Sequence, residues 1–128
     1  MMPPLFKVCA SNPHVVRVFG LNPVRIFPWG QAFDESGLIP KTPYAVWSVI
    51  NGTGQAYLEN RSDLDEIDTQ IDVYGESEKV VLQAAEIIRQ AIEKESYVTS
   101  FVPLGIDQEA QLLRFTMTAT WHVPRLFS

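Results

Sequence analysis

The sequence contains few of the residues from which metal sites and catalytic sites are usually built. Its 128 residues include one cysteine, Cys9, and two histidines, His14 and His122. A single cysteine excludes a disulfide within the chain. No two of the candidate ligands have the spacing of a zinc site, and we therefore expect neither a metal ion nor a cofactor.

The usual signals of a catalytic centre are also absent. Cys9 falls on the apolar face of a predicted short helix, which is where an inert, buried cysteine is commonly found. The pair Gly52 and Gly54 is not followed by the Lys-Ser/Thr of a phosphate-binding loop, and we expect a hairpin turn there instead. Because no nucleophile lies beside a recognisable base, we expect no catalytic residues and no enzymatic activity.

The sequence lacks clustered positive charge and long apolar runs. The formal net charge is -5, and the ten Lys and Arg residues are scattered along the chain. This balance argues against binding to a nucleic-acid backbone. No apolar run approaches the roughly 18 residues that span a membrane. The N-terminal residues lack the pattern of a secretory signal, and we expect a protein made in the cytoplasm.

The composition of the chain predicts one folded domain, residues 1–128. Hydrophobic residues make up 46% of the chain and charged residues 20%, a balance typical of globular rather than disordered proteins. We expect short helices at about 5–9 and 13–19, a brief strand at 25–27, a long loop at 28–43, strands at 44–50, 65–74, 97–104 and 111–123, a helix at 78–93, and turns at 51–54 and 105–107. This order predicts an α+β fold, with an antiparallel or mixed sheet, one long helix, and short N-terminal helices packed on one side.

The strand predicted at 65–74 has two chemically different faces. One face carries Ile67, Thr69, Ile71 and Val73. The opposite face carries Glu66, Asp68 and Asp72. By itself such a row is most simply a solvated sheet face. An alternative is a surface past which DNA must move without binding, because like charge repels phosphate.

Several apolar side chains lie where no regular element is predicted. They occur in the loop rich in proline and glycine and at the C-terminal end. An aromatic residue in such a loop often serves an interface between proteins. The interface candidates are Trp29, Phe33, Leu38, Ile39, Leu126 and Phe127.

Three segments together resemble a known family. The first is residues 43–50 with Gly52 after it, and the second is residues 71–75 leading into the alanine-rich helix. The third is residues 25–28. Together they resemble the tail-completion proteins, also called tail-terminator or tail-to-head joining proteins, of long-tailed bacteriophages. The most telling element is residues 70–74, and the resemblance covers nearly the whole chain.

The resemblance implies an α+β fold with no enzymatic activity and no cofactor. Members of the family form a ring, commonly of six copies, on the head-proximal end of the tail tube. The ring ends tube growth and offers a surface to the head connector. The expected partners are other copies of the chain, the tail tube protein and the head-completion or connector protein, while DNA passes without specific binding. The expected location is the virion, with no membrane involved.

The sequence departs from the family pattern in two places, a longer loop at residues 31–39 and the Leu126-Phe127 tail. In a tail terminator, Glu66, Asp68 and Asp72 are the candidates to line the channel. Two other functions stay open. A small-molecule-binding or regulatory α+β domain would need a deep pocket with converging polar groups. An enzyme has the least support, because no catalytic cluster is visible.

Overall fold

The computed structural model describes residues 3–21, 23–28, 40–54, 64–109 and 111–124. All six interface candidates, Trp29, Phe33, Leu38, Ile39, Leu126 and Phe127, lie outside these residues. The elements along the chain are α1 (Leu5–Ala10), α2 (Pro13–Phe19), β1 (Ile26–Phe27), β2 (Tyr44–Gly54), β3 (Leu64–Gly75), α3 (Glu78–Ile92), β4 (Ser96–Asp107) and β5 (Leu112–Pro124).

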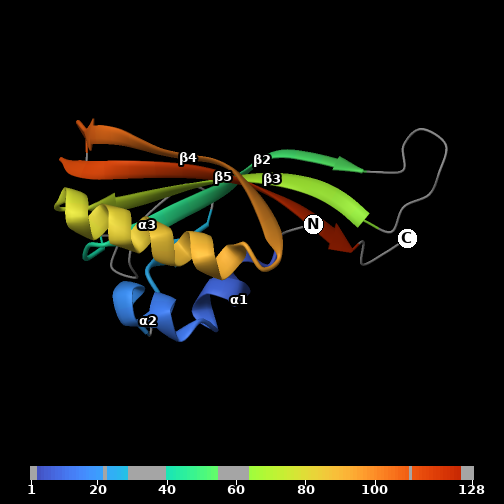
Figure 1. Ribbon diagram of the computed structural model, residues 1–128, viewed down its shortest axis with the longest axis horizontal. Coiled ribbons are helices and arrows are strands. Elements are labelled where there is room, and N and C mark those ends of the chain that lie inside the picture. The colour runs from blue at the N-terminus through green and yellow to red at the C-terminus, as the bar shows by residue number, and fades with distance from the viewer. Residues whose placement is uncertain (1–2, 22, 29–39, 55–63, 110, 125–128) are drawn as a thin grey trace.

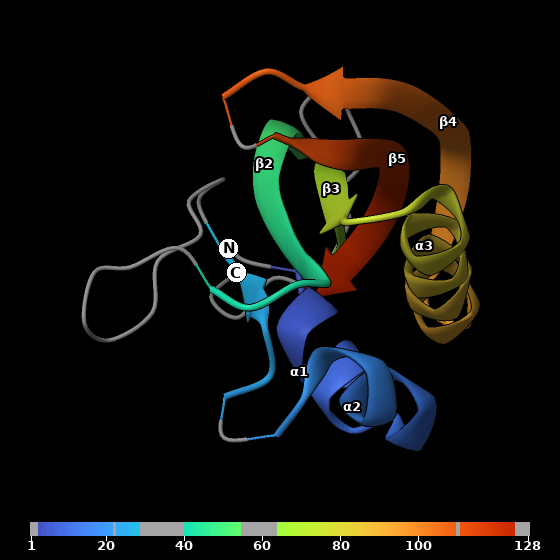
Figure 2. The same ribbon diagram turned by 90° about the vertical axis from the view of Figure 1, so that its left-hand side faces the viewer.

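The strands form one five-stranded sheet in the order β1-β2-β3-β5-β4. The short strand β1 pairs parallel with β2, and the other neighbours pair antiparallel. Helix α3 packs on β3 and β5 and also contacts α1 and α2, so the helices lie on one side of the sheet (Figure 1). The view in Figure 2 shows the strands curving past this helical layer. The predicted α+β fold is confirmed.

Local capping fixes where the helices begin. The Asn12 side chain accepts hydrogen bonds from the backbone N–H groups of His14 and Val15, at 2.9 and 3.3 Å, and Pro13 starts α2. The Ser77 side chain accepts from the backbone N–H of Val80 at 3.3 Å and starts α3. These bonds satisfy N–H groups that have no partner inside the helix. Among the described residues, no helix has the length and apolar character needed to cross a membrane.

The core lies between α3 and the sheet. The buried residues of α3 recur every three or four positions and are Val81, Ala84, Ala85, Ile88, Ala91 and Ile92. They join buried side chains of β3 and β5 such as Ile71, Met117 and Trp121 in one cluster. At the start of α3 the helix and strand approach closely, because a Cβ at Gly75 would lie 3.1 Å from the Val81 Cβ.

The helical period of the sequence places Val80 on the same apolar stripe as Val81 and the alanines of the 78–93 helix, but Val80 is not buried. Val80 is 38% exposed, whereas the next residue, Val81, is 5% exposed. Val80 lies in the first turn of α3, and because a helix turns by about 100° per residue its side chain points in a different direction from that of Val81. The predicted stripe was therefore one residue too wide at this end.

Two predicted turns are strand instead. Residues 51–54 continue β2 and pair with residues 65–68 of β3, so the hairpin turn expected at Gly52 and Gly54 is wrong. Gly105, Ile106 and Asp107 likewise stay in β4 and pair with residues 112–114 of β5. The register of β2 shifts between Val49 and Asn51, just before these residues, and that of β4 shifts between Pro103 and Gly105, where Gly105 has a φ of 85°. Pairing with a long neighbouring strand overrides the local preference for a turn.

Val81→Asp is expected to destabilise the protein by about 3 kcal/mol or more, because it places an unpaired carboxylate in the core. Val80→Asp is the matched control. It introduces the same carboxylate one residue away at an exposed position in the first turn of α3, where we expect a change below about 0.5 kcal/mol. Urea denaturation followed by circular dichroism measures both. Equal losses in the two variants would contradict the packing of α3 described above.

Candidate functional site

The candidate site is the face of the sheet that points away from the helices. It centres on Glu66, Asp68 and Asp72, which we call the acidic face. These residues alternate along β3 with the buried residues Ile67, Thr69, Ile71 and Val73. The register places each carboxylate opposite a polar residue of β5: Glu66 with His122, Asp68 with Thr120, and Asp72 with Thr116.

Each carboxylate of the acidic face has a partner across the strands. The Thr120 hydroxyl donates to Asp68 Oδ1 at 2.7 Å, and Asn51 Nδ2 donates to Asp68 Oδ2 at 3.3 Å. Glu66 Oε1 lies 3.4 Å from His122 Nε2. The carboxylates therefore form an ordered polar ladder between β3 and β5, in which Glu66 and Asp68 stay in contact with solvent and Asp72 does not.

Asp72 differs from the other two carboxylates because it is buried, at 8% exposed. Arg114 Nη2 donates to Asp72 Oδ2 at 3.1 Å, and the Thr116 hydroxyl donates to Asp72 Oδ1 at 2.7 Å. Gln70 Nε2 lies 3.2 and 3.3 Å from the two carboxylate oxygens. A carboxylate out of water needs such charged and hydrogen-bonded partners. The negative charge that reaches solvent from this face therefore comes mainly from the half-buried Glu66 and Asp68.

Two tyrosines extend the same face beyond Asp72. The rings of Tyr44 and Tyr74 stack with centroids 5.0 Å apart. Burial raises the pKa of Tyr74 to about 12, Arg114 opposes the shift, and Asp72 adds to it. Burial and Asp107 raise the pKa of Tyr44 as well. Both phenols therefore stay protonated at neutral pH, where they can donate hydrogen bonds but cannot act as bases.

The described residues offer no arrangement that suggests catalysis. Cys9 is fully buried, and burial raises the pKa of its thiol to about 12, so it is not a nucleophile at neutral pH. His14 is exposed on α2, and His122 pairs with Glu66. Among the described residues, no group of three or more His, Cys, Asp or Glu side chains could hold a metal ion. The absence of enzymatic activity stays a prediction.

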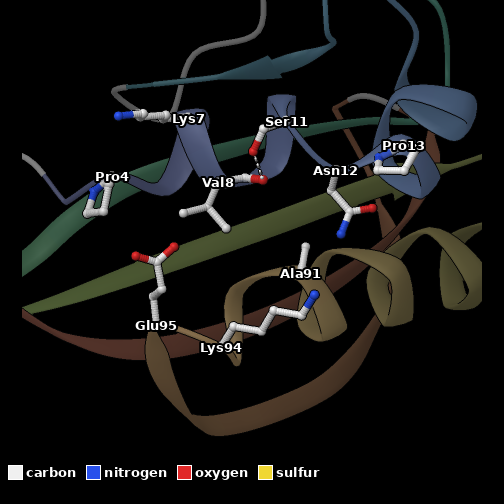
Figure 3. Close-up of a pocket in the computed structure, with 9 residues that line it drawn as sticks. All are labelled: Pro4, Lys7, Val8, Ser11, Asn12, Pro13, Ala91, Lys94 and Glu95. Atoms are coloured by element: carbon white, nitrogen blue, oxygen red, sulfur yellow. Dashed lines mark hydrogen bonds between the residues drawn. The ribbon is translucent and has the colours of Figure 1, made fainter.

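The hollows among the described residues are not built around a ligand. One, of about 360 Å³, lies between α1, the start of α2 and the end of α3 (Figure 3). Its Ser11 hydroxyl donates to the Val8 carbonyl, and its Asn12 caps α2. A second, of about 310 Å³, contains Arg25, whose guanidinium donates to the carbonyls of Pro43 and Val18. Ser11, Asn12 and Arg25 are thus already bonded to the chain itself and give no support to a small-molecule site, while Lys7, Lys94 and Glu95 also line the first hollow.

Sequence reasoning missed one group of exposed apolar residues, on the outer strand of the sheet. Tyr97, Val102, Leu104 and Ile106 all lie on β4 and are exposed. The missed signal is the composition of residues 96–107, which contain a single charged residue, Asp107. Such a neutral strand is expected between two neighbours, but among the described strands β4 pairs only with β5.

Comparison of the sequence with protein-family models gives no match, and a search among curated proteins finds no relative. The fold is therefore established by the structure alone. The function rests on the residues and on the resemblance carried by residues 25–28, 43–50 and 70–92.

Arg114→Met is expected to lower the free energy of unfolding by about 1–3 kcal/mol, because Asp72 loses its cationic partner while staying buried. Arg17→Met is the matched control on exposed α2, with an expected change below about 0.5 kcal/mol. When Asp72 is already replaced by Asn, Arg114→Met should lower the free energy of unfolding by less, because no buried charge is left without a partner. Urea denaturation of the wild type, Arg114→Met, Asp72→Asn and the double variant measures the coupling between the two positions. An undiminished loss would contradict the pairing of Arg114 with Asp72.

Proposed function

We propose that this chain is a structural protein of a long-tailed bacteriophage and forms a ring at the head-proximal end of the tail tube. In this role it ends tube growth and provides the surface to which the head connector binds. The observation that carries the proposal is the combination in residues 70–92 of a Gln-Ile-Asp-Val-Tyr strand segment followed by an alanine-rich helix. In the structure these residues form the end of β3 and all of α3.

Two features of the surface support a role in assembly. In the two hollows described above, Ser11, Asn12 and Arg25 are bonded to the chain itself, whereas a ligand site requires polar groups that are free to meet a ligand. They do contain exposed apolar residues along the outer strand β4, and such residues commonly mark contacts between proteins. The partners proposed are further copies of the chain in a ring of six, the tail tube protein and the head-completion or connector protein.

Within the ring, we propose that Glu66 and Asp68 face the channel through which DNA passes. Their carboxylates repel the phosphate backbone and keep the DNA mobile. Asp72 contributes less to this repulsion, because Arg114 neutralises it inside the sheet. The interface candidates Trp29 and Phe33 and the Leu126-Phe127 tail keep their proposed role in contacts with neighbouring proteins.

An early stop codon in the gene is expected to yield full heads beside detached tails of abnormal or uncontrolled length. Electron microscopy of the lysate measures this directly, and a plasmid copy of the intact gene is the control that should restore joined particles. Normal, infectious particles from the stop-codon lysate would contradict the proposal and leave the small-molecule-binding alternative as the better one.

Reversing the charge of the channel residues, with Glu66→Lys and Asp68→Lys together, is expected to slow DNA release while particles still assemble. The lysines would attract the phosphates that the carboxylates repel. Gln83→Lys is the control, since it adds positive charge on exposed α3, on the other side of the sheet. The release rate of DNA from purified particles, followed with an intercalating dye, measures the effect. An unchanged release rate would contradict the proposal that Glu66 and Asp68 face the channel.

A further inference from the structure

The charged residues of the sheet are distributed in an unusual way. The edge strand β4 has one charged residue, Asp107, at its far end, and β2 has none. The charges lie instead on the inner strands β3 and β5, in Asp65 and the acidic face and in Arg114. Soluble proteins commonly place charge on edge strands, because unpaired backbone groups there invite another strand. Neither β4 nor the uncovered part of β2 has protection by charge, although β4 contains Pro103 and both strands contain register shifts.

The second outer side of the sheet is only partly covered. Strand β1 pairs with Ala45 and Val46 alone. From Trp47 to Gly54, no described strand pairs with the outer side of β2. Val49 and Ile50 are exposed along this stretch, and Ile50 is 52% exposed. Among the described residues, the sheet therefore has two uncharged edges without a strand partner, one along β4 and one along the second half of β2.

One exposed residue of β4, Tyr97, lies level with the uncovered part of β2, whereas Val102, Leu104 and Ile106 lie toward the other end of the sheet. The register pairs Tyr97 of β4 with Thr120, Thr120 with Asp68, and Asp68 with Asn51 of β2. This row of paired residues runs straight across the sheet and ends at Asn51, the residue that follows Ile50 in β2. Tyr97, at its β4 end, is 69% exposed. A second copy moved sideways along the row brings its Ile50 beside the Tyr97 of the first copy.

The strand directions also suit such an arrangement. β2 and β5 are both antiparallel to β3, and β4 is antiparallel to β5, so β4 runs antiparallel to β2. A neighbouring copy in the same orientation therefore presents an antiparallel strand. Antiparallel edges can exchange regular backbone hydrogen bonds.

We propose that β4 of one copy pairs with the open part of β2 of the next copy, so that the sheets join head to tail. This inference rests on the proposed function and specifies how copies of the ring contact one another. The sheet continues from copy to copy without turning over, and the acidic faces of all copies stay on one side. Tyr97 packs beside Ile50 of the neighbour, and both become buried.

A second copy in this orientation covers more of the exposed surface than a twofold pair does. Two copies joined by β4 alone would leave residues 47–54 and Ile50 open in both. Head-to-tail contacts use one edge of each kind, and a closed ring leaves neither edge open. The two edges of one copy thus complement each other in direction, level and lack of charge.

The test uses two single variants of the full chain, Tyr97→Lys on the β4 edge and Ile50→Lys on the β2 edge. Leu21→Lys is the control, because it places a lysine at an exposed apolar position outside the sheet. Sedimentation velocity at increasing concentration is expected to give assemblies for the wild type and for Leu21→Lys. Each edge variant should remain monomeric, with a dissociation constant raised about a hundredfold or more.

Mixing the two edge variants distinguishes the head-to-tail contact from other contacts. The Ile50→Lys protein keeps an intact β4 edge and the Tyr97→Lys protein an intact β2 edge, so the mixture should form a one-to-one dimer and nothing larger. If Ile50→Lys instead dimerises with itself while Tyr97→Lys stays monomeric, the contact is between two β4 strands and the proposal is overturned. Edge variants that assemble like the wild type overturn it as well.

Hydrogen exchange on the wild type gives a readout that needs no variant. Assembly is expected to slow exchange of backbone amides in β4 and in residues 47–54, because strand pairing ties up these groups. Unchanged exchange in both segments, or a wild type that stays monomeric at every concentration, overturns edge pairing. Neither result touches the proposed function, which the stop-codon lysate decides separately.

Discussion

The fold depends on the burial of one face of α3 against the β3–β5 pair. That contact removes the apolar stripe of the helix from water, and burial of this kind is the main favourable term in folding. The stripe contains alanines among larger residues, and Gly75 has no side chain where the strand meets Val81, so the helix lies close to the sheet. With the sheet covered on this side, its opposite side is the one left to carry polar residues and to meet partners.

The polar side of the sheet is ordered by the same register that builds the core. Because β3 and β5 alternate in phase, every carboxylate of the acidic face meets a hydroxyl, an imidazole or a guanidinium of β5. The most enclosed carboxylate, Asp72, has the strongest set of partners, and the outer ones keep access to solvent. Asp72 therefore stabilises the sheet, whereas Glu66 and Asp68 keep charge that can act on a passing polyanion such as DNA.

The proposed assembly uses strand edges that are not packed in the core. This sheet has helices on one side and its charges on β3 and β5, so its least charged long strands are β4 and β2. Tyr97 and Ile50 mark those strands at one level, in a geometry that lets identical copies pair. A ring built in this way would present the carboxylates of all copies on one continuous surface. Repeating the same contact around the ring makes the assembly more stable than any single contact between two copies.

The sequence by itself determined the elements whose signals are local. The caps at Asn12 and Ser77, the alternation along β3 and the stripe of α3 follow from residues close together along the chain, and the structure confirms them apart from the exposed Val80. Only the tertiary structure decided the ends of β2 and β4, the pairing of Asp72 with Arg114, and the exposure of the β4 edge. These depend on which strand lies beside which, and residues more than 40 positions apart come together only when long-range pairing closes the sheet.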